Sequence, residues 1–470
     1  MAVKQRFKRT FPILIGDLFI ILFSYVAAYY LRLQFGALPR FSEIIPLPFL
    51  LLMTLSYLAI FYFFDSYKLE KSYFTVNFFG RIFFSVLVAA IFTSFLKYGL
   101  FLFPIGRGIL FFANLIILVA IFLWRGFCHK LFKYLIKPKR LIIIGAGKTG
   151  QEIAKVIDST VSDFEILGFL DDDEGKKGEY FPALQLKVLG STDKIPDLVE
   201  NHETDQIVMA VPEEKNPQLI KNILKTRLKG IPVIDVPEMY QILKEKVPLR
   251  YIKDDWFLKQ DGIERSGNIF VIRIKRLIDI FISSLIFLAS LPLWLLVAPL
   301  IKINSKGPVF YTQKRVGKNE SIFSLFKFRS MIEKAEKGEA LWADENDKRI
   351  TLTGKILRKL HLDELPQVWN VIKGEMSLVG PRPERPEFVE KLNREIPYYS
   401  FRHFIKPGLT GWAQVNFPYA SSLEDSREKL EYDLYYISHM NLFLDFRILL
   451  KTIKKVLFRR QEKPEKLQKK

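Results

Sequence analysis

Two adjacent carboxylates, Asp363 and Glu364, have the residue types and spacing for chemistry on a charged substrate. Pro366 follows them, and proline is tolerated only in the first turn of a helix, so we expect both acids at the N-terminus of a helix ending near residue 372. The helix dipole favours the ionised form there by roughly 0.3 to 1 kcal/mol. A charged pair suits a Mg²⁺ site, or one oxygen could attack phosphorus. The alternative role for the pair is a simple helix cap.

Cationic residues and rigid loops surround these acids in the sequence. One basic group lies within residues 313–317 and a second includes Lys327 and Arg329, with a short apolar run between them. Ammonium and guanidinium groups at this spacing suit phosphate oxygens, and the alternative is a solvated basic face. Downstream, residues 378–384 and 404–415 are rich in proline and glycine and also carry Arg, Lys, Thr and Gln. Such composition favours fixed loops that form a binding site.

Other elements must position this region, and composition limits what they are. The chain has 470 residues, which predicts about three domains. It carries 70 Lys and Arg against 50 Asp and Glu, a net charge of +20, while 49% of its residues are hydrophobic. The hydrophobic content excludes general disorder, and cations beside apolar segments favour membrane lipids as partners over nucleic acid. Cys128 is the single cysteine, so an intrachain disulfide and a cysteine-based zinc site are both excluded.

A transmembrane region of four helices is predicted over residues 1–130. Each of its four apolar segments is long enough to cross a hydrocarbon core. The segments are Phe11–Leu33, Ile44–Phe64, Ile82–Pro104 and Gly108–Phe127. Basic residues gather before the first, between the second and third, and after the fourth, which predicts that the N-terminus and everything after residue 128 are cytoplasmic. Asp17 lies inside the first segment, and we expect it to pair helices or to snorkel.

A Rossmann-like α/β domain is predicted over residues 140–250. A buried strand at Leu141–Ile144 leads into a glycine turn, and a second strand at Phe164–Leu170 ends on Asp171, where a ribose-binding acid is expected. Further strands at Gln206–Val211 and Ile231–Val236 flank a helix near Asn216–Leu228. The candidate cofactor-binding glycines are Gly145, Gly147 and Gly150. They could admit a phosphate at the helix N-terminus, but we favour the alternative that they allow close packing in a structural or dimerising domain.

Two further segments are predicted to meet the membrane. Residues 270–306 contain a fifth apolar stretch with Pro292 in its interior and basic residues at both ends, which favours a re-entrant helix hairpin. The alternative is a fifth span, which would put the rest of the chain outside the cytoplasm. Residues 441–460 alternate apolar and basic residues at helical spacing, which predicts a basic helix lying at the membrane surface, and 461–470 form a basic disordered tail.

The C-terminal part resembles the bacterial sugar transferase family, the polyprenyl-phosphate hexose-1-phosphate transferases of exopolysaccharide, capsule and O-antigen biosynthesis. The strings that carry the resemblance are Lys275-Arg276 with Asp279, GPVFYTQKRVG from Gly307, KFRSM from Lys327, LDELPQVWNVIKGEMSLVGPRPE from Leu362 and GLTGWAQV from Gly408. Four N-terminal helices and a Rossmann-like domain are similar to the long-form members. One departure is Ser290-Leu291-Pro292, where many relatives have adjacent serine and proline. The implied fold is a multi-domain membrane protein with a mainly α-helical catalytic module over residues 307–460.

The resemblance implies a covalent mechanism and a set of site residues. Asp363 would attack the β-phosphate of a UDP-sugar, UMP would leave, and undecaprenyl phosphate would then take the sugar phosphate. Glu364 would bind Mg²⁺. Phosphate charge would be neutralised by Lys327, Arg358 and Arg382, with Pro381 and Arg382 near the uridine. The implied sugar is glucose or galactose, and the implied protein is a homodimer in the bacterial inner membrane with its catalytic domain in the cytoplasm.

Two other functions compete with this one. The glycine turn with Tyr240 and Lys244 matches the spacing of an NAD-dependent nucleotide-sugar dehydratase or epimerase, although that function leaves the C-terminal 200 or so residues unexplained. The second alternative is a non-enzymatic factor of polysaccharide assembly, for which Asp363 would be inert.

Overall fold

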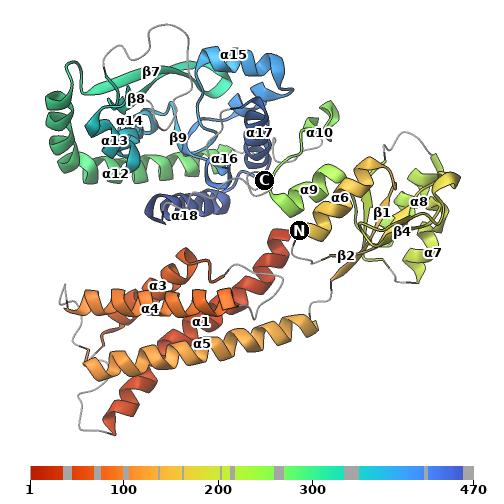
Figure 1. The fold of residues 1–470 in the computed structure, drawn as a ribbon, viewed down its shortest axis with the longest axis horizontal. Coiled ribbons are helices and arrows are strands. Elements are labelled where there is room, and N and C mark those ends of the chain that lie inside the picture. The colour runs from red at the N-terminus through yellow and green to blue at the C-terminus, as the bar shows by residue number, and fades with distance from the viewer. Residues whose placement is uncertain are drawn as a thin grey trace. The chain divides into compact units, whose positions relative to one another are not determined.

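The computed structural model describes eleven stretches of the chain, which form two compact units, Met1–Leu243 and Lys244–Lys470 (Figure 1). The described residues are 2–34, 45–67, 76–98, 105–135, 138–160, 164–201, 204–211, 217–258, 269–332, 349–417 and 422–458. Each unit is considered by itself. The predicted basic tail over 461–470 lies outside the described residues.

The first unit begins with four apolar helices. They are α1 (Ala2–Leu33), α3 (Leu47–Phe63), α4 (Val76–Tyr98) and α5 (Arg107–Leu135). Three of them are long and apolar enough to cross a membrane, whereas α3, which follows Pro46, has only 17 residues. The predicted helix-pairing role of Asp17 is confirmed, because its carboxylate lies 2.5 Å from Arg125 of α5 in the buried interior.

A six-stranded sheet completes the first unit. Its strands are β1 (Lys139–Ile144), β2 (Phe164–Leu170), β3 (Tyr180–Phe181), β4 (Leu186–Gly190), β5 (Gln206–Met209) and β6 (Val233–Asp235). The order is β3-β4-β2-β1-β5-β6, and every pair is parallel except β3 with β4. The accompanying helices are α6 (Lys148–Ser159), α7 (Ile195–Glu200), α8 (Pro217–Leu228) and α9 (Val236–Lys244). The chain therefore winds outward from β1 first on one side and then on the other.

The second unit is mainly helical and contains two small sheets. Its helices are α10 (Asp254–Leu258), α12 (Ile269–Asn304), α13 (Leu352–Lys359), α14 (Gln367–Lys373), α15 (Pro386–Glu395), α16 (Trp412–Asn416), α17 (Leu423–Ser438) and α18 (Leu442–Phe458). The 3₁₀ turns are η4 (Lys318–Glu320), η5 (Leu362–Glu364) and η6 (Tyr399–Phe404). An antiparallel hairpin joins β7 (Phe310–Val316) to β8 (Ile322–Phe328), and β9 (Ser377–Val379) pairs in parallel with β10 (Gly408–Thr410).

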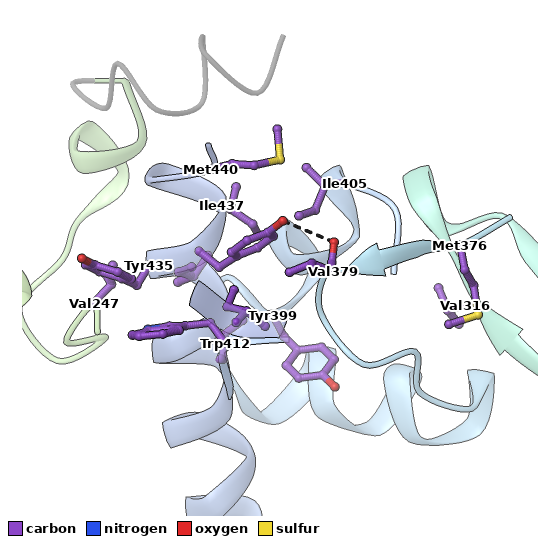
Figure 2. Packing of buried hydrophobic residues seen from close by; sticks show 14 of the residues in the cluster. Val247, Val316, Met376, Val379, Tyr399, Ile405, Trp412, Tyr435, Ile437 and Met440 are labelled. Carbon is purple, nitrogen blue, oxygen red and sulfur yellow. Dashed lines mark hydrogen bonds between the residues drawn. The ribbon is translucent and has the colours of Figure 1, made fainter. Parts of the chain in front are cut away.

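One core holds the second unit together, and a segment that precedes α12 contributes to it. Val247 lies beside Tyr435 of α17 in this core (Figure 2), and Trp256 is buried in the same cluster. Glu245 forms a double ion-paired hydrogen bond with Arg447 of α18, at 3.0 Å each. The catalytic module predicted to start at residue 307 thus packs with residues 245–258 of the same unit.

The long apolar helix α12 differs in form from the predicted hairpin. It is a single helix with Pro292 and Pro299 inside it, and its ribbon changes direction part-way along (Figure 1). Such a bend is expected where proline removes a hydrogen bond from a helix interior. A separate returning helix is not seen in the described residues, so re-entry into the membrane stays a prediction.

Both ends of α12 are hydrogen-bonded to the other elements of the second unit. Near its start, Arg276 donates to the carbonyls of Val371 and Ile372, at 2.5 and 2.7 Å. Beyond its end, Arg329 donates to the carbonyls of Ser305 and Lys306, at 2.7 and 3.0 Å. The helix therefore begins and ends against one folded body.

The C-terminal helix α18 corrects the arrangement predicted for 441–460, of which 459 and 460 lie outside the described residues. Lys451 donates to Asn416 at 2.8 Å and Lys455 to the carbonyl of Gln414 at 2.6 Å, so both cations are bonded to α16. The exposed residues of α18 include large apolar side chains instead. These are Phe443, Phe446, Ile453, Val456 and Leu457. The apolar side of the helix is therefore available to a membrane, while Lys451 and Lys455 are bonded within their own unit.

Candidate active site

The acidic pair lies in the 3₁₀ turn η5, immediately before α14. Pro366 is the N-cap of α14, which starts at Gln367, so the acids precede the helix instead of forming its first turn. His361, at a left-handed φ of 54°, reverses the chain between α13 and this turn. A left-handed backbone is unfavourable for a residue with a Cβ, and such conformations gather at functional sites. The turn presents two carboxylates to the residues of β8 and of the loop after β9.

Glu364 is clamped between two cations. Its Oε1 accepts hydrogen bonds from Lys327 Nζ at 3.0 Å and from Arg382 Nη2 at 2.6 Å. Burial by itself would raise the pKa of Glu364, but Arg382 and Lys327 together hold that pKa well below its ordinary value. The opposite balance holds at Lys327, where burial outweighs the attraction of Glu364 and lowers the pKa of the ammonium. The structure thus brings together three predicted site residues, Lys327, Glu364 and Arg382.

Asp363 is in a different state from its neighbour. Its side chain is only 7% exposed, and burial followed by repulsion from Glu364 raises the pKa of its carboxyl group. Electrostatic interactions with Lys327, Arg358 and His361 oppose that increase. A carboxylate with a raised pKa is more basic than an exposed aspartate and is a better nucleophile once ionised. The two neighbouring carboxyl groups therefore differ, because the pKa of Asp363 is raised while that of Glu364 is held low.

Arg358 and Arg329 have separate environments. Arg358 of α13 donates from Nε to the hydroxyl of Ser330 at 2.9 Å, and its charge acts on Asp363. Gly354 permits this approach, because a Cβ there would lie 1.9 Å from the Ser330 carbonyl. Arg329 was predicted to bind phosphate, but its guanidinium is buried on the carbonyls that follow α12. Ser330 was missed by the sequence analysis, although it lies within the KFRSM string and anchors Arg358.

The carboxylates are a partial fit to the predicted Mg²⁺. No cluster of three or more acidic, histidine or cysteine side chains suitable for a metal occurs among the described residues. Mg²⁺ commonly uses one or two carboxylates with substrate phosphates and water. Glu364 Oε1 is already shared by two cations, while Oε2 accepts only a long contact of 3.4 Å from Arg382. Asp363 and Glu364 Oε2 would thus suit a metal that arrives with a diphosphate.

The glycine turn of the first unit was the weaker candidate. Gly150 of α6 lies against the carbonyl of Gly145, which a Cβ at position 150 would meet at 1.9 Å, and Gly145 has a φ of 100°. The acid after β2, Asp171, accepts a hydrogen bond from the backbone of Ala146 within the turn, at 2.8 Å. Gly147, where a Cβ would have open space, is the N-cap of α6. Gly145 and Gly150 thus lie in close packing and Gly147 does not, and the packing role that we favoured for the turn stays a prediction.

Comparison with known families agrees with the site. The model of the bacterial sugar transferase family matches residues 270–459, and that of a CoA-binding domain matches residues 62–237. A protein of Xanthomonas campestris pv. campestris is 32% identical over 74% of this chain and 73% of its own length. The chain belongs to the bacterial sugar transferase family. This relative is a UDP-glucose:undecaprenyl-phosphate glucose-1-phosphate transferase.

Other members of the family differ in the sugar that they are named for. A UDP-N-acetylgalactosamine-undecaprenyl-phosphate N-acetylgalactosaminephosphotransferase of Aeromonas hydrophila is 42% identical over 50% of this chain. The chain spans about half of that relative's length, 54%. An undecaprenyl-phosphate glucose phosphotransferase of Komagataeibacter xylinus is 32% identical over 68% of this chain and 60% of its own length.

Proposed function

We propose that this protein transfers a sugar 1-phosphate from a UDP-sugar to undecaprenyl phosphate through a phosphosugar bound to Asp363. The observation that carries the proposal is the position of a buried, basic Asp363 beside the clamp formed by Glu364, Lys327 and Arg382. Relatives named as undecaprenyl-phosphate sugar phosphotransferases support the transfer reaction in this proposal.

In the first step, a carboxylate oxygen of Asp363 bonds to the β-phosphorus of the donor. The bond between that phosphorus and the bridging oxygen breaks, and UMP leaves with the bridging oxygen and its electron pair. Lys327, Arg358 and Arg382 offset the charge that develops on the phosphate oxygens. An ionised Asp363 carboxylate has no proton to lose, so its attack needs no separate base. Because burial and Glu364 raise the pKa of Asp363, the attack does need a pH above that raised pKa.

In the second step, a phosphate oxygen of undecaprenyl phosphate attacks the same phosphorus and releases the Asp363 carboxylate. The product is an undecaprenyl diphosphate sugar, and the enzyme returns to its starting state. An acyl phosphate is open to hydrolysis, so exclusion of water by burial of Asp363 protects the intermediate. A Mg²⁺ held by Asp363 and Glu364 Oε2 would supply further neutralisation of the diphosphate when bound.

We further propose that α12 enters and leaves the membrane on the cytoplasmic side. Large apolar side chains are exposed along its length, while Arg276 and the carbonyls after its end are bonded to one folded unit. A membrane-spanning helix would separate these ends by about 30 Å of hydrocarbon. The exposed apolar side of α18 would lie at the same surface.

Cysteine labelling tests this topology. In a Cys128→Ser background, we expect Arg273→Cys and Lys306→Cys, at opposite ends of α12, to react with a membrane-impermeant reagent only from the cytoplasmic side. Reaction of the two positions from opposite sides would show that the helix spans the bilayer.

A donor panel tests the reaction. Membranes containing the protein are incubated with radiolabelled UDP-glucose, UDP-galactose or UDP-N-acetylgalactosamine and with undecaprenyl phosphate. We expect UMP release and transfer of label to lipid with at least one donor. Conversion of the sugar with bound NAD and without UMP release would favour the dehydratase or epimerase. No conversion of any donor by a folded protein would favour the assembly factor.

A further inference from the structure

The loop that carries Arg382 is held by its carbonyl groups. Four consecutive carbonyls each accept a hydrogen bond from another element. Pro381 accepts from Gly408 N at 2.9 Å, Arg382 from Arg402 Nη2 at 2.9 Å, Pro383 from Arg315 Nη1 at 3.1 Å and Glu384 from Val316 N at 2.9 Å. Since Pro381 and Pro383 have no N–H group, carbonyls are the main backbone groups by which this loop can be fixed.

The hydrogen bond to the Arg382 carbonyl comes from Arg402, which is a buried arginine. Its side chain is 5% exposed, and a buried guanidinium is costly unless it is paired. Here Asp433 of α17, 1% exposed, lies 2.9 Å from Nη2, and Nη1 donates to the Tyr399 hydroxyl at 2.5 Å. The planar guanidinium thus donates two hydrogen bonds and forms an ion pair at the same time, an arrangement that an ammonium group does not reproduce in the same geometry.

A buried ion pair often contributes less stability than apolar side chains of the same size would, so stability alone does not explain this one. The pair lies at one end of a continuous series of contacts. Asp433 holds Arg402, Arg402 holds the carbonyl of Arg382, and the Arg382 guanidinium donates to Glu364 at 2.6 Å. The main chain of Arg382 is therefore fixed at one end of the residue, and its guanidinium is held at the other.

We propose that Arg402, held by Asp433, is a positioning residue that sets the Arg382 guanidinium for the diphosphate of the nucleotide-sugar donor. This inference rests on the proposed function for the identity of the donor. It predicts that Arg402 acts on the substrate only through Arg382, because the contacts of Arg402 in the site pass through the Arg382 carbonyl.

A mutant cycle in the full chain tests this dependence. Arg402→Met alone would leave Asp433 buried without its partner, so the test variant is Arg402→Met with Asp433→Asn, which removes both charges. We expect this variant to bind UDP about tenfold more weakly, with a similar rise in the KM for the UDP-sugar and a smaller change in kcat. Arg402→Lys, which keeps the charge but not the planar fork, should fall between the variant and the wild type.

The decisive arm adds Arg382→Gln. If Arg402 acts through Arg382, the triple variant binds UDP no more weakly than Arg382→Gln alone. If the losses multiply, Arg402 acts independently and the proposal is overturned. Arg394→Gln serves as the matched control, because within the described part of the chain Arg394 pairs with an exposed glutamate on α15. The affinity of this control variant for UDP should be unchanged.

UDP binding is measured separately from turnover so that the two proposals fail in different ways. Coupled binding losses in a protein that releases no UMP would refute the proposed reaction and keep the positioning role. Multiplying losses in a protein that does release UMP would refute the positioning role and keep the reaction. Wild-type affinity in the Arg402→Met, Asp433→Asn variant would also overturn the positioning role.

Discussion

Each unit of the molecule contains an aspartate with a shifted pKa, and the two shifts have opposite directions. Asp171 in the first unit accepts hydrogen bonds from the backbone of Ala146 and Asp173 and from Lys176, at 2.8, 3.0 and 3.3 Å. These groups outweigh the effect of burial and lower the pKa of Asp171. At Asp363 in the second unit, burial and the neighbouring Glu364 prevail and raise the pKa.

The difference separates an acid that is bonded to its own loop from one that we propose to be reactive. The Asp171 carboxylate stabilises its own domain, since its hydrogen bonds connect the glycine turn to the end of β2. Asp363 is kept buried and basic, and the nearby cations are bonded to Glu364. A sequence can therefore match a glycine-rich binding motif and its acid, while the acid is hydrogen-bonded within the protein and not to a ligand. We expect substitutions at the two sites to have separate consequences.

The largest expected effect is at Asp363. Asp363→Asn should lower UMP release by at least about a thousandfold, because a carboxamide cannot form the acyl phosphate. Stability should not fall, since the substitution removes a charge that burial disfavours. The measurement is UMP release beside thermal unfolding. Turnover by Asp363→Asn at the wild-type rate would show that Asp363 is not the nucleophile.

Glu364→Gln should lower turnover by about a hundredfold, because it removes the negative charge that Lys327 and Arg382 surround. If Glu364 also binds Mg²⁺, the variant should need more metal for half-maximal activity. Turnover is titrated against Mg²⁺ concentration for both proteins. An unchanged metal titration would show that Glu364 does not bind Mg²⁺. The fall in turnover at saturating Mg²⁺ would then report only on its contacts with Lys327 and Arg382.

The activity of the protein should depend on pH through the ionisation of Asp363. The raised pKa of Asp363 means that kcat/KM starts to fall at a pH above the ordinary aspartate value of 3.8, as the nucleophile becomes protonated. The residual activity of Glu364→Gln should fall only at a lower pH than that of the wild type, because the variant lacks the Glu364 charge that helps to raise the pKa of Asp363. A fall at an unchanged pH would show that burial alone sets the pKa of Asp363.

The smallest expected effect is at Asp171. Asp171→Asn should destabilise the first unit by about 1 kcal/mol through weaker hydrogen bonds, with UMP release unchanged. The lowered pKa predicts that this stability is present above the ordinary value of 3.8 and is lost as the pH falls through the native pKa. Hydrogen exchange of β1 and α6 measures the local change. A loss of UDP-sugar turnover would instead connect the glycine turn to the reaction.

The sequence predicted much of this arrangement, and its errors have a common cause. Apolar length and strand patterns identified α1, α4, α5, β1 and β2, because these depend on neighbours along the chain. Arg329 was assigned to phosphate from a pair of cationic groups around a short apolar run, and Lys451 to the membrane surface from the amphipathic pattern of residues 441–460. The structure bonds both of them to groups of their own unit, which are distant in sequence.

What the sequence by itself determined is the inventory of the site: two adjacent acids, the surrounding cations and the rigid Pro381–Pro383 loop. Local chemistry suffices for that, because charge, proline and hydrophobic period act over a few residues. Which carboxyl group has the raised pKa, and which cations meet Glu364, was decided only by the tertiary structure. Burial and hydrogen bonds from β8, η6 and the loop after β9 set the pKa of Asp363, the clamp on Glu364 and the anchor of Arg382. Those effects depend on distances across the fold, which are not written in the order of the residues.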